Sequence, residues 1–154
     1  YEYIQKDGVE KRWHSNGQII SESNYKDGKP DGLWVGWHEN GQKRSQLNHT
    51  DGKRDGLLIE WYENGQKKKE INYKDDYWDG LWIDWYENGQ KESEENYKDG
   101  KREGLSTTWY ENGQKKSEVN YKDGKVSGNT RYWTEDGKPK PKPNKTKRIP
   151  IPKK

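Results

Sequence analysis

Short runs of alternating apolar and polar residues recur along this chain, and each run is bounded by glycine-containing turns. In residues 80–103, the run Gly-Leu-Trp-Ile-Asp-Trp-Tyr is followed by Glu-Asn-Gly-Gln, then by Lys-Glu-Ser-Glu-Glu-Asn-Tyr and by Lys-Asp-Gly-Lys. Apolar runs separated by Asn-Gly or Asp-Gly are typical of β-strands in hairpins. Each unit therefore predicts two short antiparallel strands and two turns, and the chain as a whole predicts an all-β repeat meander.

The unit repeats every 24 residues without an insertion. A fixed period of roughly 20–50 residues indicates a repeat architecture, in which each unit packs against its neighbours. Residues 1–12 and the last unit depart most from the pattern, as expected for degenerate units that cap an array. The main columns are tryptophan at 13, 37, 61, 85, 109 and 133, glycine at 8, 32, 56, 80, 104 and 128, and tyrosine or histidine at 25, 49, 73, 97 and 121.

The pair Asn88-Gly89 predicts a two-residue type I′ turn, which needs positive φ at both central positions. Cross-strand partners would then have residue numbers that add up to 177, so that Gly80 faces Tyr97 and Trp82 faces Glu95. We expect the tyrosine ring to cover the strand glycine, an arrangement that fixes the register of a hairpin.

The composition argues against a compact core. The chain has 18 Leu, Ile and Val residues and 20 Trp and Tyr residues, and it lacks Ala, Phe, Met and Cys. Because side chains alternate along a strand, Leu33 and Val35 point to one face of the sheet, and Trp34 and Gly36 point to the other. The stems of Lys and Gln can cover the indole rings. We therefore expect the 24-residue β-hairpins to form an extended, twisted, single-layer antiparallel sheet.

Charge divides the chain into an array over residues 1–137 and a tail over residues 138–154. The array has 22 basic and 27 acidic residues, a net charge of −5, whereas the tail carries eight Lys or Arg residues and no acid. Repeated Lys-Pro predicts an extended polyproline II arm. We expect residues 139–152 to rest on a Trp- and Tyr-rich face of their own or a neighbouring array. The candidate basic arm comprises Lys140, Lys142, Lys145, Lys147 and Arg148.

No catalytic constellation emerges from the repeated polar residues. His14 and His38 stand in a column otherwise held by tyrosine, and His49 stands in the second tyrosine column, so we interpret all three as substitutes for structural aromatic residues. The serines recur without a recurring base, no glycine-rich turn opens a helix to hold phosphate, and the Asp-Gly turns lack the ligand pattern of a calcium loop. We expect no enzyme activity, no metal, no cofactor and no small-molecule substrate.

A column of large apolar residues is the first candidate for function. It contains Trp34, Leu58 and Trp82, and an unusual turn places Tyr77 and Trp78 nearby. The alternative is that these side chains only pack against one another. The basic arm is the second candidate, and its alternative is a solvated linker. The candidate binding strip comprises Trp34, Tyr77, Trp78 and Trp82.

The unit Gly-Leu-Trp-x-x-Trp-Tyr-Glu-Asn-Gly-Gln-Lys, followed by Asn-Tyr-Lys-Asp-Gly, resembles the MORN variant repeat of bacterial proteins, which are often grouped as antitoxin-like. The resemblance covers about residues 1–137 and implies a hairpin-stacked sheet used for binding. Classical MORN arrays have been linked to phospholipid and protein contacts. The residues that match most directly are Gly52, Gly56, Trp61, Tyr62, Gly65 and Tyr73.

Two functions follow as hypotheses. The first is a non-enzymatic scaffold that binds a protein through one face of the sheet, and the antitoxin-like resemblance implies a toxin as that protein. The second is an envelope or surface module whose tail binds an anionic polymer such as lipid head groups, glycan or nucleic acid. The sequence has no apolar run long enough for a membrane span or a signal sequence, and it begins at Tyr1 without a Met. We expect a cytoplasmic protein if it is an antitoxin, and a secreted or envelope protein if a leader preceded Tyr1.

Overall fold

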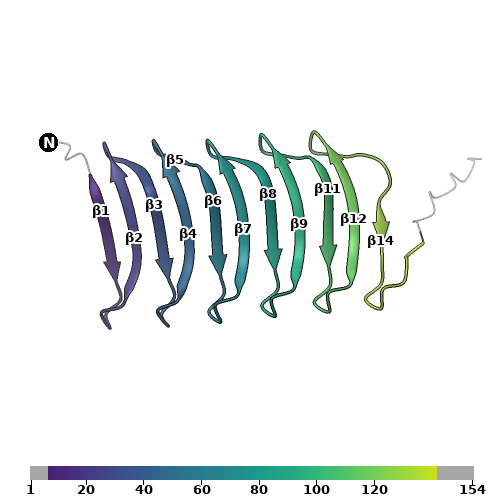
Figure 1. Cartoon of the computed structure of the whole chain (residues 1–154), viewed down its shortest axis with the longest axis horizontal. Helices are drawn as coiled ribbons and strands as arrows, with labels where there is room; N and C mark the ends of the chain where they lie inside the picture. Colours follow the sequence, from purple (N-terminus) through teal and green to yellow (C-terminus); the bar gives the residue numbers. More distant parts are fainter. Residues whose placement is uncertain (1–6, 142–154) are drawn as a thin grey trace, which may run out of the picture.

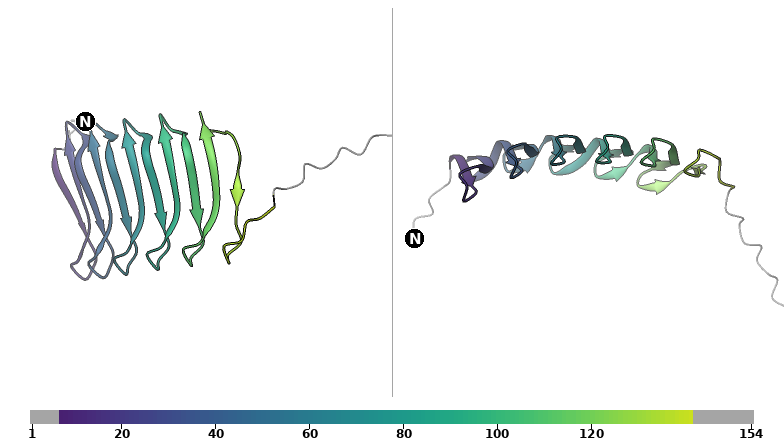
Figure 2. Two further views of the ribbon diagram at one scale, coloured as in Figure 1. Left: turned by 45° about the vertical axis from the view of Figure 1, so that its right-hand side comes forward. Right: turned by 90° about the horizontal axis from the view of Figure 1, so that it is seen from below.

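The structure is a computed structural model that describes residues 7–141, and in these residues every regular element is a β-strand. Fourteen strands form one open antiparallel sheet, which the end-on view in Figure 2 shows as a single row of hairpins. This confirms the predicted all-β, single-layer meander. The strands are β1 (Gly8–Trp13), β2 (Ile19–Lys26), β3 (Lys29–Trp37), β4 (Lys43–Thr50), β5 (Lys53–Arg54), β6 (Gly56–Trp61), β7 (Lys67–Lys74), β8 (Tyr77–Trp85), β9 (Lys91–Lys98), β10 (Lys101–Arg102), β11 (Gly104–Trp109), β12 (Lys115–Lys122), β13 (Lys125–Val126) and β14 (Arg131–Tyr132).

Strands that follow one another along the chain lie side by side (Figure 1). The short strands β5, β10 and β13 extend the pairing of the strand before them across a turn. At the carboxyl end of the array, β14 pairs with β12 and the backbone of Lys140 donates to the carbonyl of Tyr132 at 2.8 Å. The other four residues of the predicted basic arm lie outside the described residues. The division at residue 138 and the contact of residues 139–152 with an aromatic face therefore stay predictions.

The Asp-Gly turns are the two-residue turns of this fold. Asp99 and Gly100 both have positive φ, 48° and 78°, and Lys98 pairs with Lys101 across the turn. Positive φ at both central residues is the requirement of a type I′ turn. A type I′ geometry therefore occurs in each unit, but at the Asp-Gly pair.

The prediction of a two-residue turn at Asn88-Gly89 is wrong. The amide of Tyr86 donates to the carbonyl of Gln90 at 2.9 Å, and the amide of Gly89 donates to the carbonyl of Tyr86 at 2.9 Å. The loop thus has three residues, of which only the glycine has positive φ, 83°. A turn followed by a left-handed glycine is the usual form of a three-residue hairpin loop.

A β-bulge compensates for the longer loop. The register shifts between Asp84 and Trp85, and the extra residue in the partner strand is Glu92. Above the bulge, Gly80 pairs with Tyr97, so the predicted register is confirmed although the predicted turn is not. A bulge of this kind accommodates one residue and increases the local twist of the strands.

The glycine column has a cause besides the predicted pairing with tyrosine. Gly80 has a φ of 105°, and a Cβ added to it would lie 3.3 Å from the Cβ of Asn72 in the preceding hairpin. The ring of Tyr97, the cross-strand partner of Gly80, packs against Trp78 and Trp82, which lie two residues before and after this glycine. A left-handed backbone is costly for any residue with a side chain, so the backbone itself requires glycine here.

We predict that Gly80→Ala lowers the free energy of unfolding by about 1–2 kcal/mol, because alanine is strained at this φ and meets Asn72. The matched control is Gly104→Ala, since Gly104 has a φ of 84° but no atom within 4 Å of the added Cβ. Urea unfolding of both variants should show the larger loss for Gly80→Ala. Equal losses would show that contact with Asn72 contributes nothing.

Candidate binding faces of the sheet

One face of the sheet carries two aromatic clusters, and we call it the aromatic face. In the first cluster the rings of Trp78 and Trp82 lie 5.0 Å apart, and Tyr97 lies 5.2 Å from the former and 5.6 Å from the latter. In the second cluster the ring centre of Trp34 lies 5.5 Å from that of Tyr25 and 4.6 Å from that of His49.

The structure brings together only part of the predicted binding strip. Trp78 and Trp82 are in contact, whereas Trp34 belongs to the other cluster, on β3. Tyr77 is 63% exposed and lies outside both clusters, beside the turn glycine Gly100. The strip is therefore two separate aromatic sites on one face.

Beside the second cluster, an open groove of about 390 Å³ crosses the first three units of the array. Its apolar wall includes Trp34, Leu47 and Leu58. Its polar lining includes charged side chains and three serines. The lining residues are Arg12, Ser21, Ser23, Tyr25, Trp34, Val35, Gly36, Arg44, Ser45, Leu47, His49, Leu58 and Glu60.

A ladder of hydrogen bonds joins each unit to the next. The hydroxyl of Tyr62 donates to the carbonyl of Trp85 at 2.7 Å, and Tyr86 repeats this bond to Trp109 at 2.8 Å. The Nε2 of His38 lies 2.8 Å from the carbonyl of Trp61. Because a carbonyl oxygen only accepts hydrogen bonds, this nitrogen carries the proton. His38 therefore replaces the tyrosine of the column, as predicted from the sequence.

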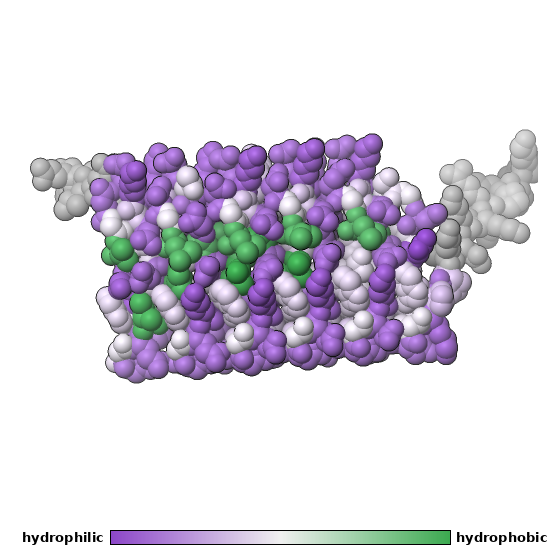
Figure 3. All heavy atoms as spheres, viewed as in Figure 1, coloured by the Kyte–Doolittle hydropathy of each residue, from purple (hydrophilic) through white to green (hydrophobic). Residues whose placement is uncertain are grey.

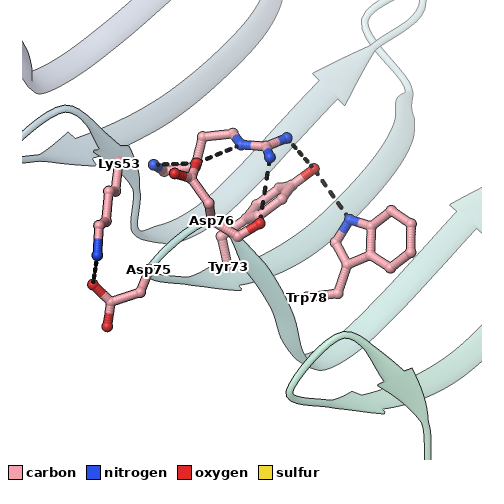
Figure 4. Close-up of polar contacts among 6 residues, drawn as sticks. Lys53, Tyr73, Asp75, Asp76 and Trp78 are labelled. Carbon is pink, nitrogen blue, oxygen red and sulfur yellow. Dashed lines mark hydrogen bonds and ion pairs between the residues drawn. The ribbon is translucent and has the colours of Figure 1, made fainter.

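The unusual turn at Asp75 and Asp76, shown in Figure 4, is held by Arg54 on β5. The backbone amide and Nε of Arg54 both donate to Oδ1 of Asp76 at 3.0 Å. Both bonds lower the pKa of the Asp76 carboxyl group, and the bond from the backbone amide has the larger effect. Asp76 has a φ of 72°, at a position where most units have glycine. The bonds from Arg54 hold the aspartate in this conformation. Arg54 also lies over the ring of Tyr73. The hydroxyl of Tyr73 accepts a hydrogen bond from the indole Nε1 of Trp78 at 3.3 Å.

The opposite face, which we call the leucine face, carries an apolar column that was not among the candidate sites predicted from the sequence. Hydrophobic side chains form a band across the strands in Figure 3. The signal was the apolar residue that follows each column glycine. The column consists of Val9, Leu33, Leu57, Leu81 and Leu105, which are between 38% and 53% exposed.

Lysine side chains cover the tryptophan column on the leucine face. The ammonium groups of Lys43, Lys67 and Lys91 lie 5.7–6.0 Å from the ring centres of the tryptophans one unit further on. Such cation–π contacts add modest attraction at exposed sites and shield the rings from water. Among residues 7–141, Ile71 and Tyr73 are the only large hydrophobic residues that are buried.

The repeats match the family model described as the MORN repeat variant, over residues 6–27, 30–51, 54–75, 78–99 and 102–123. The chain belongs to this family. The matches begin 24 residues apart, which confirms the period. MORN repeats are in general non-catalytic modules that bind proteins or membrane lipids.

No curated protein matches the chain. Within residues 7–141, no group of three or more His, Asp or Glu side chains could hold a metal ion. The same residues form no helix that is long and apolar enough to cross a membrane.

Burial of His49 predicts a pH dependence of stability. His49 is 8% exposed, and burial lowers its pKa from about 6.5. The negative charge of Asp76 raises this pKa, and the positive charge of Arg54 lowers it. The unfolded chain therefore binds the proton more readily than the folded chain. Stability is full above about pH 6.5 and falls as the pH decreases toward the folded pKa. We predict that His49→Tyr, which restores the column residue, removes this loss.

The measurement is urea unfolding of the wild type and His49→Tyr between pH 5 and 8. His38→Tyr is the control, because His38 also stands in a tyrosine column but lies in the ladder, outside the groove. An unchanged pH slope in His49→Tyr would contradict the assignment.

Proposed function

We propose that the protein is a non-enzymatic scaffold whose aromatic face binds a protein partner. The observation that carries this proposal is the open groove beside the Trp34 cluster, on a face that presents a second aromatic cluster farther along. Partly exposed Trp and Tyr side chains give large contact area with little loss of conformational entropy, and they are enriched at protein interfaces.

The sheet supports this use because each unit is fixed to the next by the tyrosine ladder and by cross-strand pairing. A partner would meet side chains on strands and would not need to order a loop. A toxin is the partner class that the antitoxin-like grouping of similar repeat proteins suggests, and we propose it as the first class to test.

The basic arm supports a second candidate function, the binding of an anionic polymer. Its test differs from that of the aromatic face, because contacts to many anionic groups weaken steeply as salt rises. Contacts between aromatic and apolar side chains are much less sensitive to salt.

The proposal is tested by photo-cross-linking in cells of the source organism. A photoreactive residue at Ser23 reports on the groove, and one at Leu33, in the neighbouring strand β3, reports on the leucine face. We expect a discrete cross-linked protein, identified by mass spectrometry, from Ser23 and not from Leu33. The same product should persist at high salt and disappear with Trp34→Ala. Equal products from both faces, or no protein product from Ser23, would overturn the proposal.

A further inference from the structure

The second family-matched unit, residues 30–51, differs from its neighbours at three positions that meet in the groove. Gly36 stands where the later units have glutamate, aspartate and threonine, Arg44 stands where they have lysine or glutamate, and His49 stands where they have tyrosine. The groove is thus a single constellation in an otherwise repeated surface. The hydrogen-bond ladders, in contrast, recur in several units.

The missing side chain at Gly36 makes room for an arginine. A Cβ at this buried glycine would lie 2.9 Å from the hydroxyl of Ser45 and 3.2 Å from a guanidinium nitrogen of Arg44. The guanidinium of Arg44 therefore lies against the strand at the floor of the groove. A side chain such as the glutamate or aspartate of the later units would occupy the same space.

Arg44 has no hydrogen-bond or ion-pair partner among residues 7–141. The four other arginines in this range each pair with an acid: Arg12 with Glu10, Arg54 with Asp76, Arg102 with Glu95 and Arg131 with Glu118. An unpaired guanidinium presents five N–H donors in a planar fork that matches a carboxylate.

A second observation points to a ligand in the same groove. The Nδ1 of His49 is buried and has no hydrogen-bond partner within the described residues, although the side chain lines the groove. A buried polar atom without a partner is costly unless water or a ligand satisfies it. The hydroxyls of Ser21, Ser23 and Ser45 line the groove as further donors.

The charge balance selects the kind of anion. Glu60 is the acid among the lining residues, and Arg12 is already paired with Glu10 at 2.8 Å. One unpaired cation beside one carboxylate favours a monoanion over a dianion such as phosphate. The wall of Trp34, Leu47 and Leu58 offers a neighbouring apolar contact. An acidic side chain next to a hydrophobic side chain, in a polypeptide, satisfies both.

We propose that the groove is a carboxylate-binding site, in which Arg44 holds an Asp or Glu side chain of a partner polypeptide. This inference rests on the proposed function and names the chemistry of its partner. The carboxylate accepts from the guanidinium and from serine hydroxyls, and the adjoining apolar residue of the partner packs on Trp34 and Leu58.

The test uses a blocked peptide of alternating Glu and Leu as the probe, with the Gln and Leu peptide and inorganic phosphate as comparisons. Binding to the full chain is followed by calorimetry and by the NMR shift of the Trp34 indole. We expect the acidic peptide to bind and the Gln peptide to bind at least tenfold more weakly. Arg44→Gln should weaken binding at least tenfold, and Gly36→Glu should abolish it by filling the floor of the groove.

Lys68→Gln is the matched control, because Lys68 holds the same position one unit later but lies over Tyr62, outside the groove. It should leave binding unchanged. Equal losses in Arg44→Gln and Lys68→Gln, equal binding of the Gln peptide, or stronger binding of phosphate would each overturn the carboxylate site. If the Ser23 cross-link survives in Arg44→Gln while the acidic peptide fails to bind the wild type, the carboxylate inference fails and the proposed function stands.

Discussion

The structure depends on the hydrogen bond by which an aromatic side chain in one unit reaches the tryptophan carbonyl of the next. Tyr62, Tyr86 and Tyr110 make this bond through their hydroxyls, and His38 makes it through Nε2. At the same end of the strands, Asn64 and its equivalents donate to a backbone carbonyl of the following loop. Because residues 7–141 bury so few large hydrophobic side chains, these polar ladders and the tilted and edge-on aromatic contacts replace a conventional core.

The sequence predicted the architecture well because period and alternation determine it. Residues one period apart fill equivalent places, and the register from Gly80 to Tyr97 follows from glycine and tyrosine columns that any reading of the repeat reveals. The turn at Asn88 could not be assigned in the same way. Asn-Gly is compatible with loops of two or three residues, and the bulge at Glu92 that distinguishes them leaves the register above it unchanged.

The candidate site was less predictable than the fold, for a physical reason. Trp34 and Trp82 were visible as large side chains in a binding column, but Gly36, Arg44 and His49 each looked like an isolated departure from the repeat. Their convergence depends on pairing across β3 and β4, where Gly36 lies opposite Ser45 and the arginine folds over the empty position. The sequence shows at which positions a unit departs from the repeat, but only the paired strands show that these positions lie together.

The central claim is that each unit is supported by its immediate neighbours alone, so that a whole unit can be removed. Deleting residues 80–103 joins Asp79 to Gly104, which holds the position of Gly80 one unit later. Urea unfolding of this shortened chain tests the claim directly. The account predicts a folded β-sheet with one cooperative transition and a smaller m-value, since less surface is exposed on unfolding. A chain without a cooperative transition would contradict it.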